Sequence, residues 1–118
     1  MLDTFTQAYI TAALWSSTTH NAAGDDVPLD DDHDESDLSP ATRADMESDC
    51  AAFYETHKAA IGDNAAGAGH DLWLTRCGHG AGFWDGDWPE PDATTLSDAA
   101  EKLGDVFLYV GDDGQIHA

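Results

Sequence analysis

The sequence predicts a single α+β domain, in which an antiparallel sheet of about three to four strands, formed by two hairpins, packs against about three helices. Apolar residues recur at helical spacing in the first half of the chain. In the second half, apolar residues alternate with other residues between glycine-rich turns, which is typical of strands. With 118 residues and 42% hydrophobic content, the chain from 1 to 118 is long enough for one domain with one core.

The first predicted element is a helix over residues 2–18. Phe5, Tyr9 and Ala12 recur at helical spacing, and Trp15 lies beside them. No basic residues precede this apolar stretch, so we expect no signal peptide. No apolar run in the sequence is long enough to predict a membrane span.

An acidic segment, residues 24–38, follows this helix, and we expect it to be a loop. Eight of the thirteen residues from Asp25 to Asp37 are acidic, and the apolar interruption is confined to residues 27–29. A run of like charges at this density is typical of a solvated loop or a sheet edge, and not of a core.

The clearest helical pattern covers residues 39–61. Ser39 is suited to cap this helix, and Pro40 is suited to its first position. One apolar stripe follows, made of Met46, Cys50, Phe53, His57 and Ile61. The glycine- and alanine-rich residues 62–69 then predict a flexible connection.

The first hairpin is predicted over residues 70–84. Leu72 and Leu74 alternate with other residues in DLWLTR, the turn CGHG is rich in glycine, and AGFW supplies a return strand. We expect Trp73, Phe83 and Trp84 to be buried against Phe53 and Leu103.

The last third of the chain predicts a helix and a second hairpin. The helix should cover residues 93–104 with Asp92 as its cap. Its inward residues are expected to be Leu96, Ala99, Ala100 and Leu103. Residues 105–110 and 115–118 predict two strands around the turn GDDG.

Residues 70–90 include three of the four Trp, and we call them the aromatic segment. Three of its side chains have metal-binding or nucleophilic chemistry, namely His70, Cys77 and His79. The paired Cys and His spacings of a structural zinc site are absent, and no third group is evident that would orient a Cys–His pair. We therefore predict no metal, no cofactor and no enzyme activity, and assign the segment to the scaffold. We also expect Cys50 and Cys77 to remain reduced thiols in a cytoplasm.

The stretch GHDLWLTRCGHGAGFWD, residues 69–85, resembles the motif GHDFWLTRNGHGAGFWDR of a small bacteriophage protein family. ALWSS near the start and LGDVFLYVGDDGQIH at residues 103–117 also resemble this family, which is mostly without an assigned function. The resemblance implies a phage or prophage origin. Cys77 stands where the family commonly has Asn, which argues against a required ligand or nucleophile there. Gly86 stands where Arg is usual, so a basic residue that is common in the family is absent at this position.

The charge balance excludes several classes of partner. The chain has 24 acidic residues, 19 Asp and 5 Glu, against 4 Lys and Arg, and its formal charge is −20. Nucleic acids and anionic membranes carry the same sign of charge and would repel it, so we expect neither as a direct partner.

Charge and resemblance together predict a phage-encoded acidic inhibitor that acts in the host cytoplasm. By mimicking nucleic acid, it would block the DNA-binding groove of a host defence complex, a CRISPR surveillance complex first and a restriction enzyme next. It resembles anti-CRISPR and anti-restriction DNA mimics in this respect. The expected partner-binding residues are Asp25, Asp26, Asp30, Asp31, Asp32, Asp34, Glu35, Asp37, Asp45 and Asp49.

Two alternatives stay open. The charge can serve solubility alone, in an acidic phage protein or one with a halophile-type surface. The second alternative is a calcium-binding module, because Asp30, Asp32 and Asp34 match loop positions 1, 3 and 5 of the helix–loop–helix calcium motif. Glu35 and Ala41 stand where that motif needs Gly and Glu, which disfavours this alternative.

Overall fold

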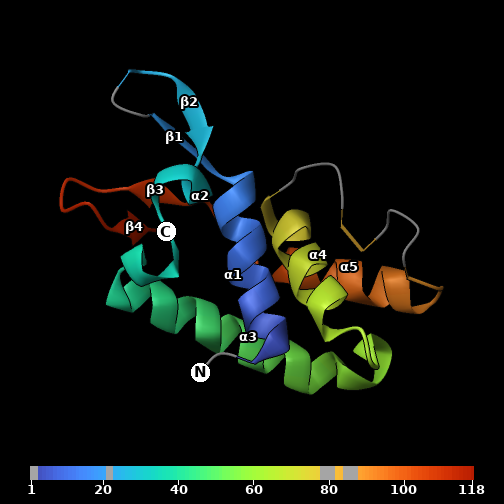
Figure 1. The fold of residues 1–118 in the computed structure, drawn as a ribbon. Helices are drawn as coiled ribbons and strands as arrows, with labels where there is room; N and C mark the ends of the chain where they lie inside the picture. The colour runs from blue at the N-terminus through green and yellow to red at the C-terminus, as the bar shows by residue number, and fades with distance from the viewer. Residues whose placement is uncertain (1–2, 21–22, 78–81, 84–87) are drawn as a thin grey trace.

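The computed structural model describes residues 3–20, 23–77, 82–83 and 88–118. Within these residues the protein is a mostly helical α+β domain with two separate two-stranded antiparallel hairpins (Figure 1). The elements are α1 (Thr4–Ser16), β1 (Thr18–His20), β2 (Asp26–Pro28), α2 (Leu29–Asp32), the 3₁₀ helix η1 (Glu35–Asp37), α3 (Pro40–Ile61), α4 (Ala65–Cys77), α5 (Asp92–Lys102), β3 (Tyr109–Val110) and β4 (Ile116–His117). The α+β class is confirmed. The expected sheet of about three to four strands against about three helices is wrong: among the described residues the hairpins form two separate sheets, and there are five α-helices and one 3₁₀ helix.

Helices α1 and α4 lie side by side at the centre of the molecule, and α3 runs across one end of the pair (Figure 1). The α1 helix confirms the prediction for residues 2–18 within a few residues, and Asp3 caps it by accepting a hydrogen bond from the Thr6 amide at 2.7 Å. Gly69 of α4 faces the α1 backbone: a Cβ at this position would overlap the carbonyl oxygen of Phe5 and lie 3.1 Å from the backbone nitrogen of Tyr9. The missing side chain therefore permits the close approach of the two helices.

The α3 helix confirms its prediction, including both signals at its start. Ser39 Oγ accepts from the Thr42 amide at 3.1 Å, and Pro40 is the first helical residue. Gly62, with φ of 60°, ends the helix. The predicted stripe is buried except at His57, which is half-buried beside Phe53 with ring centroids 4.8 Å apart.

The hairpin predicted over residues 70–84 is wrong, because residues 65–77 form the helix α4. The six residues from Asp71 to Arg76 are all buried, so every side of the helix is covered and no helical stripe separates apolar from polar positions. The flexible connection 62–69 is wrong from Ala65 onward for the same reason. Of the predicted return strand, Gly82 and Phe83 form a bend and a turn, whereas residues 81 and 84 lie outside the described residues.

The acidic segment 24–38 is wrong as a loop, because it contains β2, α2 and η1. Thr19 pairs with Val27 in the β1–β2 hairpin, and the Leu29 amide donates to Ser17 O at 2.8 Å. Leu29 is fully buried, so the short apolar interruption attaches an otherwise acidic segment to the core.

The C-terminal elements follow their prediction with shorter bounds. In α5, Leu96 and Ala100 are buried as expected, whereas Leu103 is 37% exposed and does not contribute to the core as predicted. Asp92 is the first residue of the helix and not its cap. The second hairpin is confirmed as β3 and β4, and an isolated bridge between Leu38 and Ile116 joins it to the end of η1.

Aromatic rings from four segments form the centre of the core. Phe53 stacks between Phe5 and Phe83, with centroid distances of 6.0 and 5.9 Å, and Trp73 meets the ring of Tyr9 edge-on at 5.5 Å. The expected burial of Trp73 and Phe83 is confirmed, at 1% and 0% exposure. The expectation for Trp84 lies outside the described residues.

Candidate functional site

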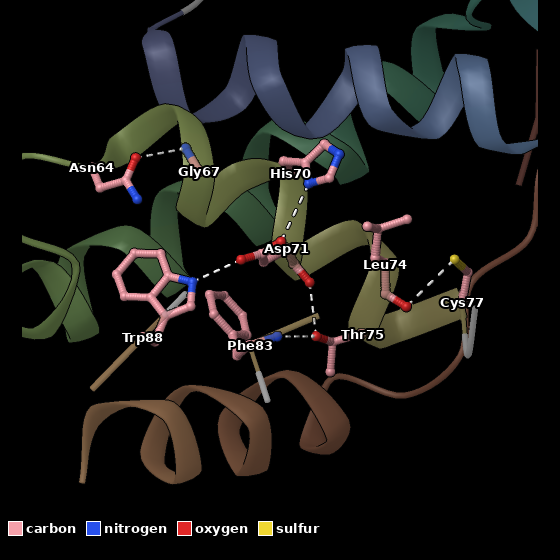
Figure 2. Close-up of polar contacts among 9 residues, drawn as sticks. All are labelled: Asn64, Gly67, His70, Asp71, Leu74, Thr75, Cys77, Phe83 and Trp88. Carbon is pink, nitrogen blue, oxygen red and sulfur yellow. Dashed lines mark hydrogen bonds and ion pairs between the residues drawn. The ribbon is translucent and has the colours of Figure 1, made fainter. Parts of the chain in front are cut away.

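The polar side chains of α4 take part in packing, beginning with Asp71 (Figure 2). This carboxylate is only 5% exposed, and its Oδ2 accepts a hydrogen bond from Trp88 Nε1 at 2.7 Å. His70 Nδ1 lies 3.2 Å from Oδ1 of the same carboxylate. Thr75 Oγ1 donates to the Asp71 carbonyl at 2.7 Å and accepts from the Phe83 amide at 3.3 Å. Together these bonds attach residues 83 and 88 to α4.

Arg76 is the second buried polar centre of α4. Its guanidinium is 7% exposed and donates to the Tyr9 hydroxyl oxygen at 2.9 Å and to Asp49 Oδ2 at 2.9 Å. It also donates to the carbonyl oxygens of Gly104 at 3.0 Å and Leu103 at 3.3 Å. One side chain thereby joins α1, α3, α4 and the end of α5. Burial raises the pKa of Tyr9 well above its ordinary value, so the hydroxyl stays neutral.

These contacts give the aromatic segment a structural explanation. Within α4, the side chains of Asp71, Trp73, Thr75 and Arg76 each take part in a hydrogen bond that joins the helix to another part of the fold, and Gly69 permits the close approach of α1. His70 and Cys77 are seven residues apart on one helix, which separates them by about 10 Å along the axis. No group of three His, Cys, Asp or Glu with the arrangement of a metal site occurs in the part of the chain that the structure describes, and His79 lies outside it.

The two cysteines should differ in reactivity. No disulfide joins Cys50 and Cys77. Cys50 is fully buried, and this burial raises its pKa to about 12, whereas Cys77 is half-buried at the end of α4. We expect iodoacetamide at pH 8 to modify Cys50 at least about tenfold more slowly than Cys77, since the thiolate is the reacting form. Peptide mass spectrometry over a time course measures both rates, and equal rates in the folded protein would contradict the burial of Cys50.

The acidic residues predicted to bind a partner lie on or directly beside successive elements, from β2 to the first half of α3 (Figure 1). We call them the acidic cluster. Its exposed members are Asp25, Asp26, Asp30, Asp31, Asp32, Asp34 and Asp45, and its half-buried members are Glu35, Asp37 and Asp49. Asp30 and Asp32 are two positions apart on the helix α2, so their side chains point about 200° apart. This arrangement differs from the encircling loop of the calcium motif, in which positions 1 and 3 face one ion.

Two members of the acidic cluster also accept hydrogen bonds from backbone amides of the same turn. Asp34 caps η1 by accepting hydrogen bonds from the amide and the hydroxyl of Ser36, and these bonds lower the pKa of Asp34. Asp37 Oδ2 accepts from the Asp34 amide at 3.1 Å and lies 3.2 Å from His33 Nδ1. The reciprocal bonds form a capping box, which fixes the direction of this acidic turn.

Asp49 differs from the rest of the acidic cluster. Its carboxylate is 38% exposed and pairs with the buried Arg76, so part of its charge is already neutralised within the fold. It lines a cavity of about 410 Å³ together with Asp45, Thr42 and Arg76. The sequence did not indicate this pairing, because the two partners are 27 residues apart and lie on different helices.

The structure adds acidic residues that the sequence prediction left out. The Ser39 amide donates to Ile116 O at 2.9 Å, which holds the β3–β4 hairpin against the start of α3. Asp112 and Asp113 in the turn of this hairpin are exposed. The hairpin that carries them is therefore attached to the chain directly after η1. The only signal for these two residues in the sequence was the turn pattern GDDG.

An open groove of about 610 Å³ lies between α1 and α4. His70 lines this groove and stacks on Trp15, with ring centroids 5.7 Å apart. Apart from Asp3 and His70, the groove is lined by small, aliphatic or neutral polar side chains.

None of the protein-family models, curated proteins or solved structures compared with this chain matches it. Among the helices in the described ranges, none combines the length and apolar character needed to cross a membrane.

Proposed function

We propose that the protein is an acidic inhibitor that occupies the nucleic-acid-binding groove of a host defence complex. A CRISPR surveillance complex is the first candidate for this partner, and a restriction enzyme is the second. The observation that carries the proposal is the concentration of exposed and half-buried carboxylates on ordered backbone, from β2 through α2 and η1, in a chain of net charge −20. The resemblance of residues 69–85 to a phage family supports an origin in which such an inhibitor acts in the host cytoplasm.

Ordered carboxylates suit this role better than a flexible acidic tail. Duplex DNA presents one charge per about 1.7 Å of its axis to rows of Lys and Arg. Asp has a short side chain with few rotamers, so the position of its charge follows the backbone closely. The attachment of Leu29 to the core and the capping box of η1 fix that backbone before binding. Less conformational entropy is then lost in the complex.

The proposal predicts that the protein displaces DNA from the complex through electrostatic competition for the same basic groove. Purified CRISPR surveillance complexes and restriction enzymes, loaded with fluorescently labelled target duplex, should release it when the protein is added. Fluorescence anisotropy measures the release over a salt series, and the apparent affinity should fall steeply as salt rises. A fourfold variant tests the acidic cluster, with Asp30→Asn, Asp31→Asn, Asp32→Asn and Asp34→Asn. We expect its apparent affinity for the complex to fall at least about tenfold and to depend less steeply on salt, since fewer ion pairs form. Asn also caps helices well, so η1 should be retained.

The matched control removes four charges elsewhere, with Asp63→Asn, Asp92→Asn, Asp98→Asn and Glu101→Gln. All four residues are exposed or half-buried and lie outside the acidic cluster. This control should keep most of the affinity. If both variants lose affinity equally, the net charge of the protein determines binding and the position of the acidic cluster does not, so the proposed mimicry of nucleic acid is wrong. A protein that binds the complexes and leaves the DNA in place would also contradict it.

A further inference from the structure

The segment that leads into β3 exposes two large aromatic side chains. Phe107 is 65% exposed and Tyr109 is 56% exposed, whereas Leu108 between them is only 8% exposed. Alternate residues of an extended chain point to opposite sides, and the exposures of residues 107–109 follow this alternation, although Phe107 also lines a cavity of about 270 Å³ together with Trp73 and Cys77. Asp105, two residues before Phe107, is also exposed. We call these three residues the outer face of β3, although β3 itself begins at Tyr109 and the other two precede it.

This outer face departs from the usual pattern of a surface hairpin. When one side of an antiparallel pair packs on a core, the other side usually carries polar residues. Here the inner side, with Leu108, packs on the core, and the outer side nevertheless carries two rings. Neighbouring exposed apolar side chains with a polar rim are typical of interaction sites.

The charges around the rings indicate that the partner surface is positively charged. Asp112 and Asp113 are exposed in the turn that follows β3. Asp113 lies 3.1 Å from His117 Nε2, and the ring of His117 stacks on Tyr109 with centroids 5.6 Å apart. Carboxylates therefore border the rings at both ends of the segment. A second copy of a chain with charge −20 would be repelled, as would an anionic membrane.

Arg side chains fit this combination of rings and carboxylates better than Lys. The planar, weakly hydrated guanidinium stacks on aromatic faces and still donates hydrogen bonds to carboxylates in its own plane. The compact ammonium of Lys is strongly hydrated and binds as a point charge.

We infer that the outer face of β3 is a docking site for arginine side chains of a protein partner, which stack on Phe107 and Tyr109 and pair with Asp105, Asp112 and Asp113. The inference rests on the proposed function for the class of partner, a basic nucleic-acid-binding groove. It adds the chemistry of recognition, since an Arg side chain that stacks on nucleobases can also stack on aromatic side chains.

Fluorescent oligoarginine and oligolysine peptides of equal length test this with defined probes and the full chain. Anisotropy titrations should show that the protein binds oligoarginine more tightly. Phe107→Ala with Tyr109→Ala should weaken oligoarginine binding about tenfold, as expected for two exposed cation–π contacts, and oligolysine binding less than about twofold. The ring-preserving control, Phe107→Tyr with Tyr109→Phe, should keep the preference. Both rings are more than half exposed, so circular dichroism and thermal unfolding should show intact folds.

Equal loss for the two peptides, or no loss for either, overturns the inference. A wild-type dimer in analytical ultracentrifugation that dissociates in the alanine variant also overturns it, since the rings would then bind a second copy. The two proposals fail separately. If the alanine variant keeps the oligoarginine preference while the acidic cluster still controls DNA release, only the docking site is wrong. If the rings control the preference but the protein releases no DNA, the groove-blocking function is wrong.

Discussion

The variant Arg76→Met is expected to lower the free energy of unfolding by about 3–5 kcal/mol, the usual cost of breaking a buried charged network. Met retains much of the volume of the side chain but none of its donors. The hydroxyl of Tyr9 and the carbonyl oxygens of Leu103 and Gly104 would lose their hydrogen bonds to the guanidinium. Leaving buried acceptors without partners costs about 1–3 kcal/mol for each group that water does not reach.

Urea unfolding followed by Trp fluorescence measures this loss. The control Asp49→Asn alters the partially exposed partner and should cost about 1 kcal/mol or less, because water and the remaining amide oxygen replace much of the ion pair. Arg76→Lys should lie between the two, since an ammonium cannot reach four acceptors at once. If Arg76→Met unfolds at the same urea concentration as the wild type, the network does not stabilise the junction of the helices.

The elements that the sequence predicted correctly have local signals. Ser39 and Pro40 mark the start of α3, and an apolar stripe marks its buried side. The second hairpin surrounds a glycine-containing turn. The failure at α4 has a physical cause, because Asp71 and Arg76 are buried through partners on other elements. Their burial removes the polar side by which an amphipathic helix is recognised in a sequence.

The candidate site was predictable in composition and not in shape. Eight acidic residues between positions 25 and 37 were evident in the sequence. That β2, α2 and η1 would order them depends on the burial of Leu29, a tertiary contact. The exposure of Phe107 was also not evident in the sequence. Residues 106–110 are an uninterrupted apolar run, which suggests a strand that is buried on both sides. Which side the core covers depends on the packing of Leu108.

Gly69→Ala is expected to destabilise the protein by about 3 kcal/mol, at the upper end of the cost of overpacking. The added Cβ would overlap the carbonyl oxygen of Phe5, which belongs to the α1 backbone and cannot rotate away. Helices α1 and α4 would have to separate, and the contact between Trp73 and Tyr9 would loosen with them. Ala is intrinsically favoured over Gly in a helix by about 1 kcal/mol, so the steric cost must exceed this gain.

Gly67→Ala is the matched control, because it makes the same change one half-turn earlier in α4. A Cβ at Gly67 would meet the side chain of Asn64, which is exposed and can rotate, and not the backbone of another helix. We expect a change of at most about 1 kcal/mol, with the helix-forming gain of Ala offsetting the lost hydrogen bond between Asn64 and the residue 67 amide. Thermal unfolding of both variants under one set of conditions gives the comparison. If the two substitutions have equal effects, the close contact between α1 and α4 at Gly69 is not what requires a glycine there.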